Sequence, residues 1–282
     1  MEELSLKKCC GSAAELERYL SVKAQTHNYY KTYSTSDRIR SWMDTDCFYL
    51  DDGSRWNDVH DRTTFNREEN DVRRFGRCFS FSRSESVAMW MLYGGMEKKG
   101  AMVEFTESAM RELVEKISSV ELGTWVEGAF RSAVTLQRED FDLILKDILY
   151  ADTHDVNAVY IRRSEESCKD ASPEVISQLR DCVKSVAWSY ENECRLILTV
   201  KKDVLPAGQK ITSVRIPLNG LLKDGKRVRI FCSPNFRGEK PFRTSRITGE
   251  VDWDLCSGCK GPSDDKNVTH SENTENSVPA TV

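Results

Sequence analysis

Short apolar runs with strand character recur along this chain, but they do not alternate regularly with helical segments. The runs rich in β-branched and aromatic residues are 47–50, 77–82, 101–105, the second half of 190–200, 211–217 and 227–232. No internal repeat of a length typical of solenoids or propellers is present. Strands and helices that mix without a strand-helix-strand rhythm predict an α+β fold.

Helical periodicity is clearest in three segments. Apolar residues recur at 3.6-residue spacing in 110–117 and again in 141–149, so both are expected to be helices that pack on a sheet. A third helix is expected from Ser172-Pro173, an N-cap followed by proline in the first turn, through Val186. A shorter helix is expected over 84–93.

Composition limits the class of protein and its partners. The 282 residues are 30% charged and 39% hydrophobic, with a formal net charge of -4, so no global field favours nucleic acid or anionic lipid. No apolar run approaches the roughly 18 residues of a membrane span, and the first residues lack a secretion signal, so we expect a cytoplasmic protein without membrane contact.

The chain is expected to have three parts. Residues 1–25 form a helical segment, and residues 26–256 form a single α+β domain. Residues 257–282 contain no aromatic residue, leucine or isoleucine, so we expect a disordered tail.

Cysteine and histidine patterns do not predict a metal site. Most of the ten cysteines are scattered without regular spacing and are expected to be reduced. Cys256 and Cys259 form one C-x-x-C, but no second pair lies nearby to complete four zinc ligands. No metal is therefore predicted.

Glu191, Glu193 and Arg195 alternate at the opening of the 190–200 segment. If this opening is a strand, all three side chains lie on one face, with successive residues about 6.6 Å apart. Arg195 would keep Glu193 ionised, and a fixed carboxylate can stabilise an oxocarbenium charge. The alternative is a structural row of ion pairs on a solvent face.

The segment 78–82 places two hydroxyls, Ser80 and Ser82, on one face of a predicted strand and two phenylalanines on the other. The hydroxyls could line a pocket. Alternatively, Ser82 or Ser84 caps the following helix while Phe79 and Phe81 fill the core.

Two further segments suggest other partners. Asp58, His60 and Asp61 cluster metal-ligand types after a strand, although a turn built on aspartate and asparagine explains them as well. The segment from Lys223 to Arg246 contains eight basic residues and only two acidic ones, with phenylalanines between them. This composition makes nucleic acid a candidate partner. Together these segments leave a metal-dependent nuclease as an alternative.

Several motifs together resemble the DUF2971 family, a domain of unknown function, over most of the region from Lys31 to Cys232. The residues that carry the resemblance are Lys31-Thr32-Tyr33, Trp56-Asn57-Asp58 with Asp61, the Ser-x-Ser strand before Met89-Trp90 and Tyr93, residues 100–105, and Lys184 with Trp188, Tyr190, Glu191, Glu193 and Arg195. One departure is Val59, where the family usually has proline.

The order of a basic residue, a Ser-x-Ser strand and a Glu-x-Glu motif also looks like the layout of ADP-ribosyltransferases. This likeness implies a mixed, mostly antiparallel split sheet with flanking helices and a cleft that binds NAD as the substrate, with an unknown macromolecular acceptor or water. The residues it implies for the site are Glu193 as catalytic carboxylate, Glu191 as the residue that orients the acceptor, and Ser80, Ser82, Lys31, Tyr33, Arg38 and Arg195 as NAD-binding residues. The alternative to an enzyme is a non-catalytic module that binds a nucleotide or a protein.

Overall fold

The fold is known from a computed structural model, which describes residues 4–66, 71–94, 99–152, 158–179, 181–237 and 239–246. The α-helices are α1 (Leu6–Cys9), α2 (Ala13–Ala24), α3 (Ser36–Thr45), α4 (Val59–Thr64), α5 (Val87–Tyr93), α6 (Glu107–Lys116) and α7 (Pro173–Gln178). Short 3-10 helices are η1 (Arg138–Asp140), η2 (Val186–Glu191), η3 (Lys202–Val204) and η4 (Leu221–Lys223). Side-chain caps start several of them: the hydroxyls of Thr35, Ser86 and Thr106 accept from backbone N–H groups in the first turns of α3, α5 and α6.

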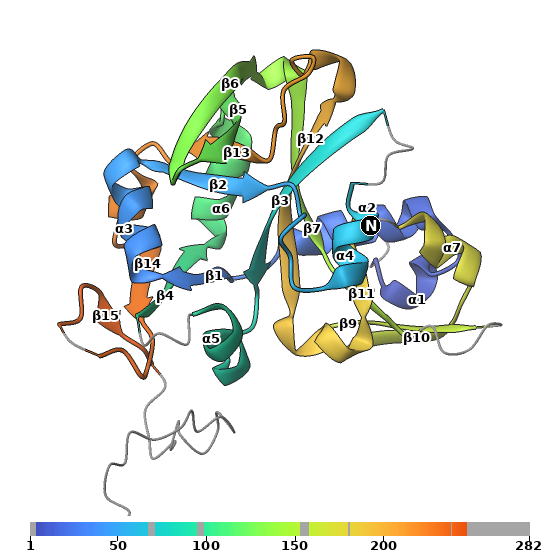
Figure 1. The fold of residues 1–282 in the computed structure, drawn as a ribbon. Helices are drawn as coiled ribbons and strands as arrows, with labels where there is room; N and C mark the ends of the chain where they lie inside the picture. The colour runs from blue at the N-terminus through green and yellow to red at the C-terminus, as the bar shows by residue number, and fades with distance from the viewer. Residues whose placement is uncertain are drawn as a thin grey trace, which may run out of the picture. The chain divides into compact units, whose positions relative to one another are not determined.

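The described strands form two sheets (Figure 1). The larger contains β1 (Tyr29–Thr35), β2 (Cys47–Asp51), β3 (Val72–Ser80), β4 (Gly100–Thr106), β5 (Ser119–Val126), β6 (Ala129–Gln137), β7 (Phe141–Asp147), β12 (Glu193–Lys201), β13 (Ser213–Pro217), β14 (Val228–Cys232) and β15 (Arg243–Thr244). The smaller contains β8 (Leu149–Asp152), β9 (Val159–Arg163), β10 (Glu166–Ala171) and β11 (Val183–Ser185). Most pairs are antiparallel, so the α+β class with a mostly antiparallel sheet is confirmed.

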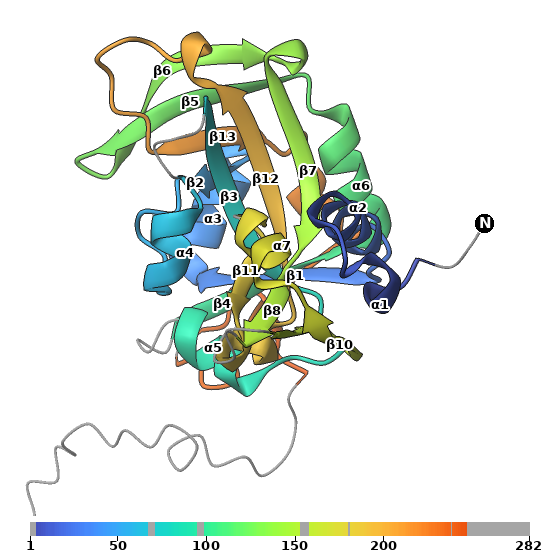
Figure 2. The same cartoon turned by 90° about the vertical axis from the view of Figure 1, so that its right-hand side faces the viewer.

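The larger sheet divides at β3. Along one edge β3 pairs with β12 over its whole length, and β12 pairs in turn with β7 (Figure 2). On its other edge, β3 meets β1 only at Ser80 and β2 only at Gly76. The helix α3 follows β1 and precedes β2, and these two strands continue into different parts of the sheet. Residues 77–79 of β3 therefore have no partner on this edge among the described strands.

Apolar packing fixes the sheets in two main clusters. The larger cluster joins the inner face of β3 and β12 to α3 and α6, with Phe75, Leu196 and Met110 among its members. The second cluster packs α1, α2 and α7 on the smaller sheet, where Leu20 and Ile161 are fully buried. Burial of this apolar area is the main force that holds these layers together.

The predicted helix over 141–149 is wrong. This segment is β7 followed by β8, with Phe141, Leu143 and Leu145 buried and Asp142 and Ile144 exposed in strict alternation. The apolar residues of a short run can fit both the two-residue period of a strand and the 3.6-residue period of a helix. In this segment the hydrogen-bonded pairing with β12 stabilises the strand.

The predicted helix from Pro173 to Val186 is confirmed only at its start. It ends at Gln178, and Val183–Ser185 is β11, which pairs in parallel with β8. The helices over 84–93 and 110–117 correspond to α5 and α6, and the predicted strands correspond to β2, β3, β4, β12, β13 and β14 with small shifts of their ends. The predicted tail lies outside the described residues, and no helix of the described part is long and apolar enough to cross a membrane.

Candidate active site

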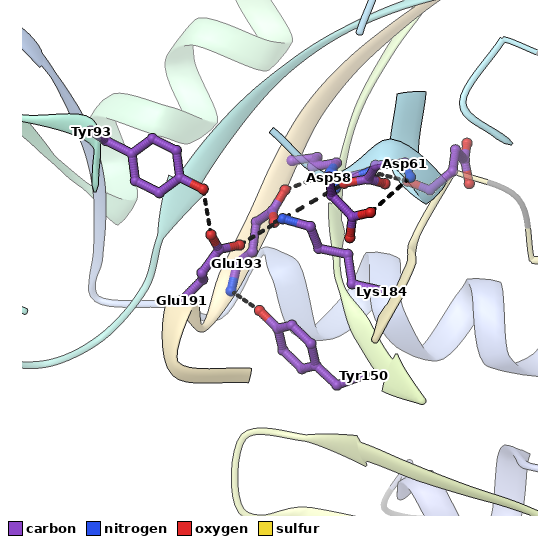
Figure 3. Close-up of polar contacts among 9 residues, drawn as sticks. Asp58, Asp61, Tyr93, Tyr150, Lys184, Glu191 and Glu193 are labelled. Atoms are coloured by element: carbon purple, nitrogen blue, oxygen red, sulfur yellow. Dashed lines mark hydrogen bonds and ion pairs between the residues drawn. The ribbon is translucent and has the colours of Figure 1, made fainter. Parts of the chain in front are cut away.

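Five charged side chains from four elements meet beside β12, opposite its core face (Figure 3). Asp61 comes from α4, Lys184 from β11 and Glu191 from the last position of η2. Glu193 and Arg195 are alternate residues of β12 and so point to the same face. All five residues are at least 95% buried.

Lys184 lies between the two glutamates. Its Nζ is 2.6 Å from Oε2 of Glu191 and 2.7 Å from Oε2 of Glu193, and Asp61 Oδ2 lies at 3.6 Å. Arg195 donates from Nε to Oε1 of Glu193 at 2.5 Å and from its two terminal nitrogens to both oxygens of Asp61. Both oxygens of Glu193 are therefore held in place by cations.

Aromatic side chains surround these ion pairs. Tyr93 donates its hydroxyl hydrogen to Oε1 of Glu191 at 2.6 Å, and the hydroxyl of Tyr150 accepts from the backbone N–H of Glu193 at 2.8 Å (Figure 3). The guanidinium of Arg195 stacks over Trp56, with 4.5 Å between the guanidinium carbon and the ring centre. These contacts restrict the rotamers of the acidic side chains.

The charges of this cluster do not balance. Three carboxylates face two cations, so full ionisation leaves one negative charge in a buried site, and one bound proton removes it. Burial and repulsion by Glu193 raise the pKa of Glu191 to about 7, although Lys184 and Tyr93 oppose the rise. Burial also disfavours ionisation of Glu193, but Arg195 and Lys184 outweigh it and hold the pKa of Glu193 well below its ordinary value. Adjacent glutamates thus differ in their protonation near neutral pH.

A cavity of about 980 Å³ borders the cluster and extends along the division of the larger sheet. Seven aromatic residues line it, namely Tyr33, Trp42, Tyr49, Trp56, Phe79, Tyr93 and Trp125. Both Glu191 and Glu193 lie in its wall, together with Lys184, Asp58 and Asp61. A concave site with aromatic walls and a few converging charges is the usual form of a small-molecule site.

Three of the sequence-predicted binding residues line this cavity: Lys31, Tyr33 and Arg38. Lys31 is 1% exposed, and its Nζ donates to the backbone carbonyls of residues 82–84, so it fixes that loop. Tyr33 packs edge-on against Trp90, and its buried hydroxyl has no hydrogen-bond partner among the described residues. Arg38 is exposed on α3.

The other predicted binding residues are not in the cavity wall. β3 ends at Ser80, so Ser82 lies outside the strand, although the two hydroxyls are 3.2 Å apart. Asn192 donates to Ser82 at 3.1 Å, so the pair stabilises the loop beside η2. Arg195 is fully buried against acidic partners and is not positioned to bind NAD directly. The cap of α5 is Ser86, not the expected Ser82 or Ser84.

The predicted row of side chains on one strand is also wrong for Glu191. This residue ends η2, and Asn192 has a left-handed conformation, with φ 42°, before β12 begins at Glu193. The alternating pattern suggested a continuous strand. Instead, the turn at Asn192 places Glu191 beside Lys184, the residue that also contacts Glu193. The solvent-exposed ion-pair row fails as well, because both glutamates are buried.

The metal-site alternative has little geometric support. Both oxygens of Asp61 accept from Arg195, and the backbone N–H of Asp61 lies 3.4 Å from Oδ1 of Asp58. Across the ranges that the structure describes, no group of three or more histidine, cysteine, aspartate or glutamate side chains could hold a metal ion. The side chain of His60 and the Cys256-Cys259 pair lie outside the described set.

The basic segment 223–246 is partly neutralised by the fold. Arg229 and Arg246 both contact Glu104, and Arg227 contacts Glu112 and Asp224. Three of the basic residues that suggested nucleic acid therefore have acidic partners, which weakens that prediction.

Sequence reasoning missed the central position of Lys184 and the contact of Tyr93. Both residues are part of the family resemblance, but a predicted helix over 173–186 gave no reason to place Lys184 beside β12. The signal that could have identified it is the short apolar stretch around Val183, which is an edge strand.

Comparison of the chain with protein-family models, with curated protein sequences and with solved structures finds no match. Any function must therefore be argued from the geometry and chemistry of the cavity.

Proposed function

We propose that the cavity binds NAD and that the protein transfers ADP-ribose to an acceptor hydroxyl or to water. The observation that carries this proposal is the buried pair Glu191 and Glu193, which share one lysine, border a large aromatic cavity and have pKa values shifted in opposite directions. Two carboxyl groups whose environments push their pKa values apart are typical of sites with one acid-base group and one permanently charged group.

Glu193 is the permanently charged group in this proposal. When the bond between nicotinamide and ribose breaks, its electron pair leaves with nicotinamide, and the ribose carbon becomes positively charged. An ionised carboxylate held at a fixed position stabilises such charge without reorganisation. Arg195 and Lys184 supply that fixation, since each holds one oxygen of Glu193.

Glu191 is the acid-base group. With a pKa of about 7, its carboxylate can accept the proton of the attacking hydroxyl when the new carbon–oxygen bond forms. Tyr93 and Lys184 orient its two oxygens. The products are then free nicotinamide, the ADP-ribosylated acceptor and one proton.

The lining of the cavity supports a ligand with flat rings. Aromatic side chains such as Tyr49 and Trp125, whose ring centres are 4.8 Å apart, offer surfaces for a base. The volume of about 980 Å³ lies at the upper end of ordinary ligand sites, which suits a dinucleotide.

The test is release of free nicotinamide from NAD by the purified protein, with and without a cell lysate as the source of acceptors. Glu193→Gln keeps the shape of the side chain and removes its charge, so kcat is expected to fall about 100-fold or more. Glu191→Gln is expected to lower kcat and to remove the acidic limb of its pH profile.

Glu112→Gln is the matched control, because Glu112 lies on α6 and its ion pairs with Lys116 and Arg227 are at the surface. Circular dichroism melting verifies that each variant is folded. Equal nicotinamide release by Glu193→Gln and wild type contradicts the proposal. Binding of NAD without any nicotinamide release by wild type would indicate a non-catalytic nucleotide-binding module instead.

A further inference from the structure

The division of the larger sheet exposes one arginine of β3 to the cavity. Arg77 lies between Gly76, which pairs with β2, and Ser80, which pairs with β1. Its side chain enters the space that opens between these two strands and lines the cavity. Sequence reasoning assigned no role to this residue.

The guanidinium of Arg77 is held in place but is not neutralised. It donates to the backbone carbonyl of Tyr49 at 3.2 Å and to the hydroxyl of Thr32 at 3.1 Å, and it stacks 4.2 Å from the ring centre of Trp42. Its Nε is buried and has no hydrogen-bond partner in the described part of the chain. Each terminal nitrogen uses one hydrogen in these contacts and keeps a second one for a further acceptor.

No carboxylate forms an ion pair with Arg77 among the described residues. Asp51 is a nearby acidic group that also lines the cavity, but its Oδ1 accepts from Ser213 at 3.1 Å. Burial and the proximity of Arg38 lower the pKa of Arg77 to about 10, a value at which it is still charged at pH 7.

A second arginine faces the same part of the cavity. Arg38 lies one turn before Trp42 on α3, and it too lines the cavity without an ion pair to any described carboxylate. Arg38 is near enough to Arg77 for the two guanidinium groups to repel each other. An anion between them removes this repulsion.

We propose that Arg77 and Arg38 form a phosphate subsite that binds the pyrophosphate of a nucleotide. Arginine suits this role because its planar donors match phosphate oxygens. The identity of the nucleotide rests on the proposed function, but binding of phosphate groups does not require any chemistry at Glu193. The cavity then has an arginine end for phosphates and an acidic end for a positively charged sugar.

The experiment is isothermal titration calorimetry of the full chain with ADP and, separately, with adenosine, at low and high salt. ADP is expected to bind at least 10-fold more tightly than adenosine, and salt is expected to weaken only ADP. Arg38→Ala is expected to weaken ADP binding about 10-fold and to leave adenosine unchanged. Arg77→Lys keeps the charge but loses the planar donors, and a loss of 10-fold or more is expected.

Arg40→Ala is the matched control, since Arg40 is an exposed arginine of the same helix that does not line the cavity. If Arg77→Lys does not fold, Arg38→Ala alone decides the result. Absence of ADP binding by wild type, equal affinity for ADP and adenosine, or an unchanged affinity in Arg38→Ala overturns the subsite. Arginine-dependent ADP binding without nicotinamide release would refute only the proposed reaction, whereas nicotinamide release with an unchanged KM in Arg38→Ala would refute only the subsite.

Discussion

Protonation of Glu191 should be visible in the stability of the whole protein. In the unfolded chain this glutamate titrates near 4.5, and in the folded protein near 7. The folded state therefore holds a proton that the unfolded state has lost between these two values, and stability falls as the pH rises through this window. A shift of this size corresponds to about 3 kcal/mol in total, of which about 2.5 kcal/mol falls between pH 5 and pH 8.

The substitution that isolates this effect is Glu191→Gln, which resembles the protonated side chain and cannot titrate. Urea unfolding at half-unit steps from pH 5 to pH 8 gives the free energy of unfolding of each protein. Wild type is expected to lose about 2.5 kcal/mol relative to Glu191→Gln over this range, with half of the loss complete at about pH 6. Glu193 does not contribute to the change over this range, because its lowered pKa affects stability only below the ordinary value of 4.5.

Glu112→Gln serves as the control for the loss of a glutamate. Attraction to Arg227 lowers the pKa of Glu112, so its effect on stability falls below pH 4.5 and its profile should run parallel to wild type above pH 5. If Glu191→Gln also runs parallel to wild type, then Glu191 is ionised at neutral pH. In that case the division of roles between the two glutamates is wrong.

Two further substitutions test the ion pairs of the buried cluster and the contact between β5 and β6. Lys184→Met leaves Glu191 and Glu193 without their shared cation, so the free energy of unfolding in urea is expected to fall by about 3–5 kcal/mol. The control is Lys226→Met at an exposed position, which should change the free energy of unfolding little. If the two variants are equally stable, the ion pairs of Lys184 are contradicted. Gly123→Ala places a methyl group 2.0 Å from the carbonyl oxygen of Arg131, where the register between β5 and β6 shifts. This variant is expected to lose about 1–3 kcal/mol of unfolding free energy in the same assay. Its control is Gly225→Ala, whose methyl group meets no atom within 4 Å.

Local sequence signals predicted α5, α6 and the start of α7, but not α3, which Thr35 caps, or the β5–β6 hairpin. The N-cap at Ser172 with Pro173 gave the correct start of α7, and the periodicity of Met110 and Leu113 gave α6. The segment 141–149 failed because its period is ambiguous until the partner strand is known. Pairing between distant segments decides such cases, and it is not contained in the pattern of one segment.

The sequence predicted the two glutamates and the contact of Arg195 with Glu193, but it did not place Lys184 or Arg77. Glu191 and Glu193 were identified by their spacing, although the turn at Asn192 makes that spacing misleading as a strand pattern. Lys184 and Arg77 could not be placed, because each becomes significant only through tertiary packing. Arg77 follows a glycine in an ordinary strand sequence. Its position in the cavity depends on β1 and β2, which each pair with β3 at a single residue on either side of it.

The two ends of the cavity depend on the same strand. Arg77 and Cys78 are consecutive in β3 and point to opposite faces, and Cys78 pairs with Arg195 of the acidic cluster. A slip of one residue between β3 and β12 would exchange these two faces, so it would turn Arg77 to the face of the buried carboxylates. The nine paired residues between the two strands prevent such a slip. Pairing of β3 with β12 thus fixes the spacing between the arginine end and the acidic end, and this spacing determines the length of ligand that can reach both.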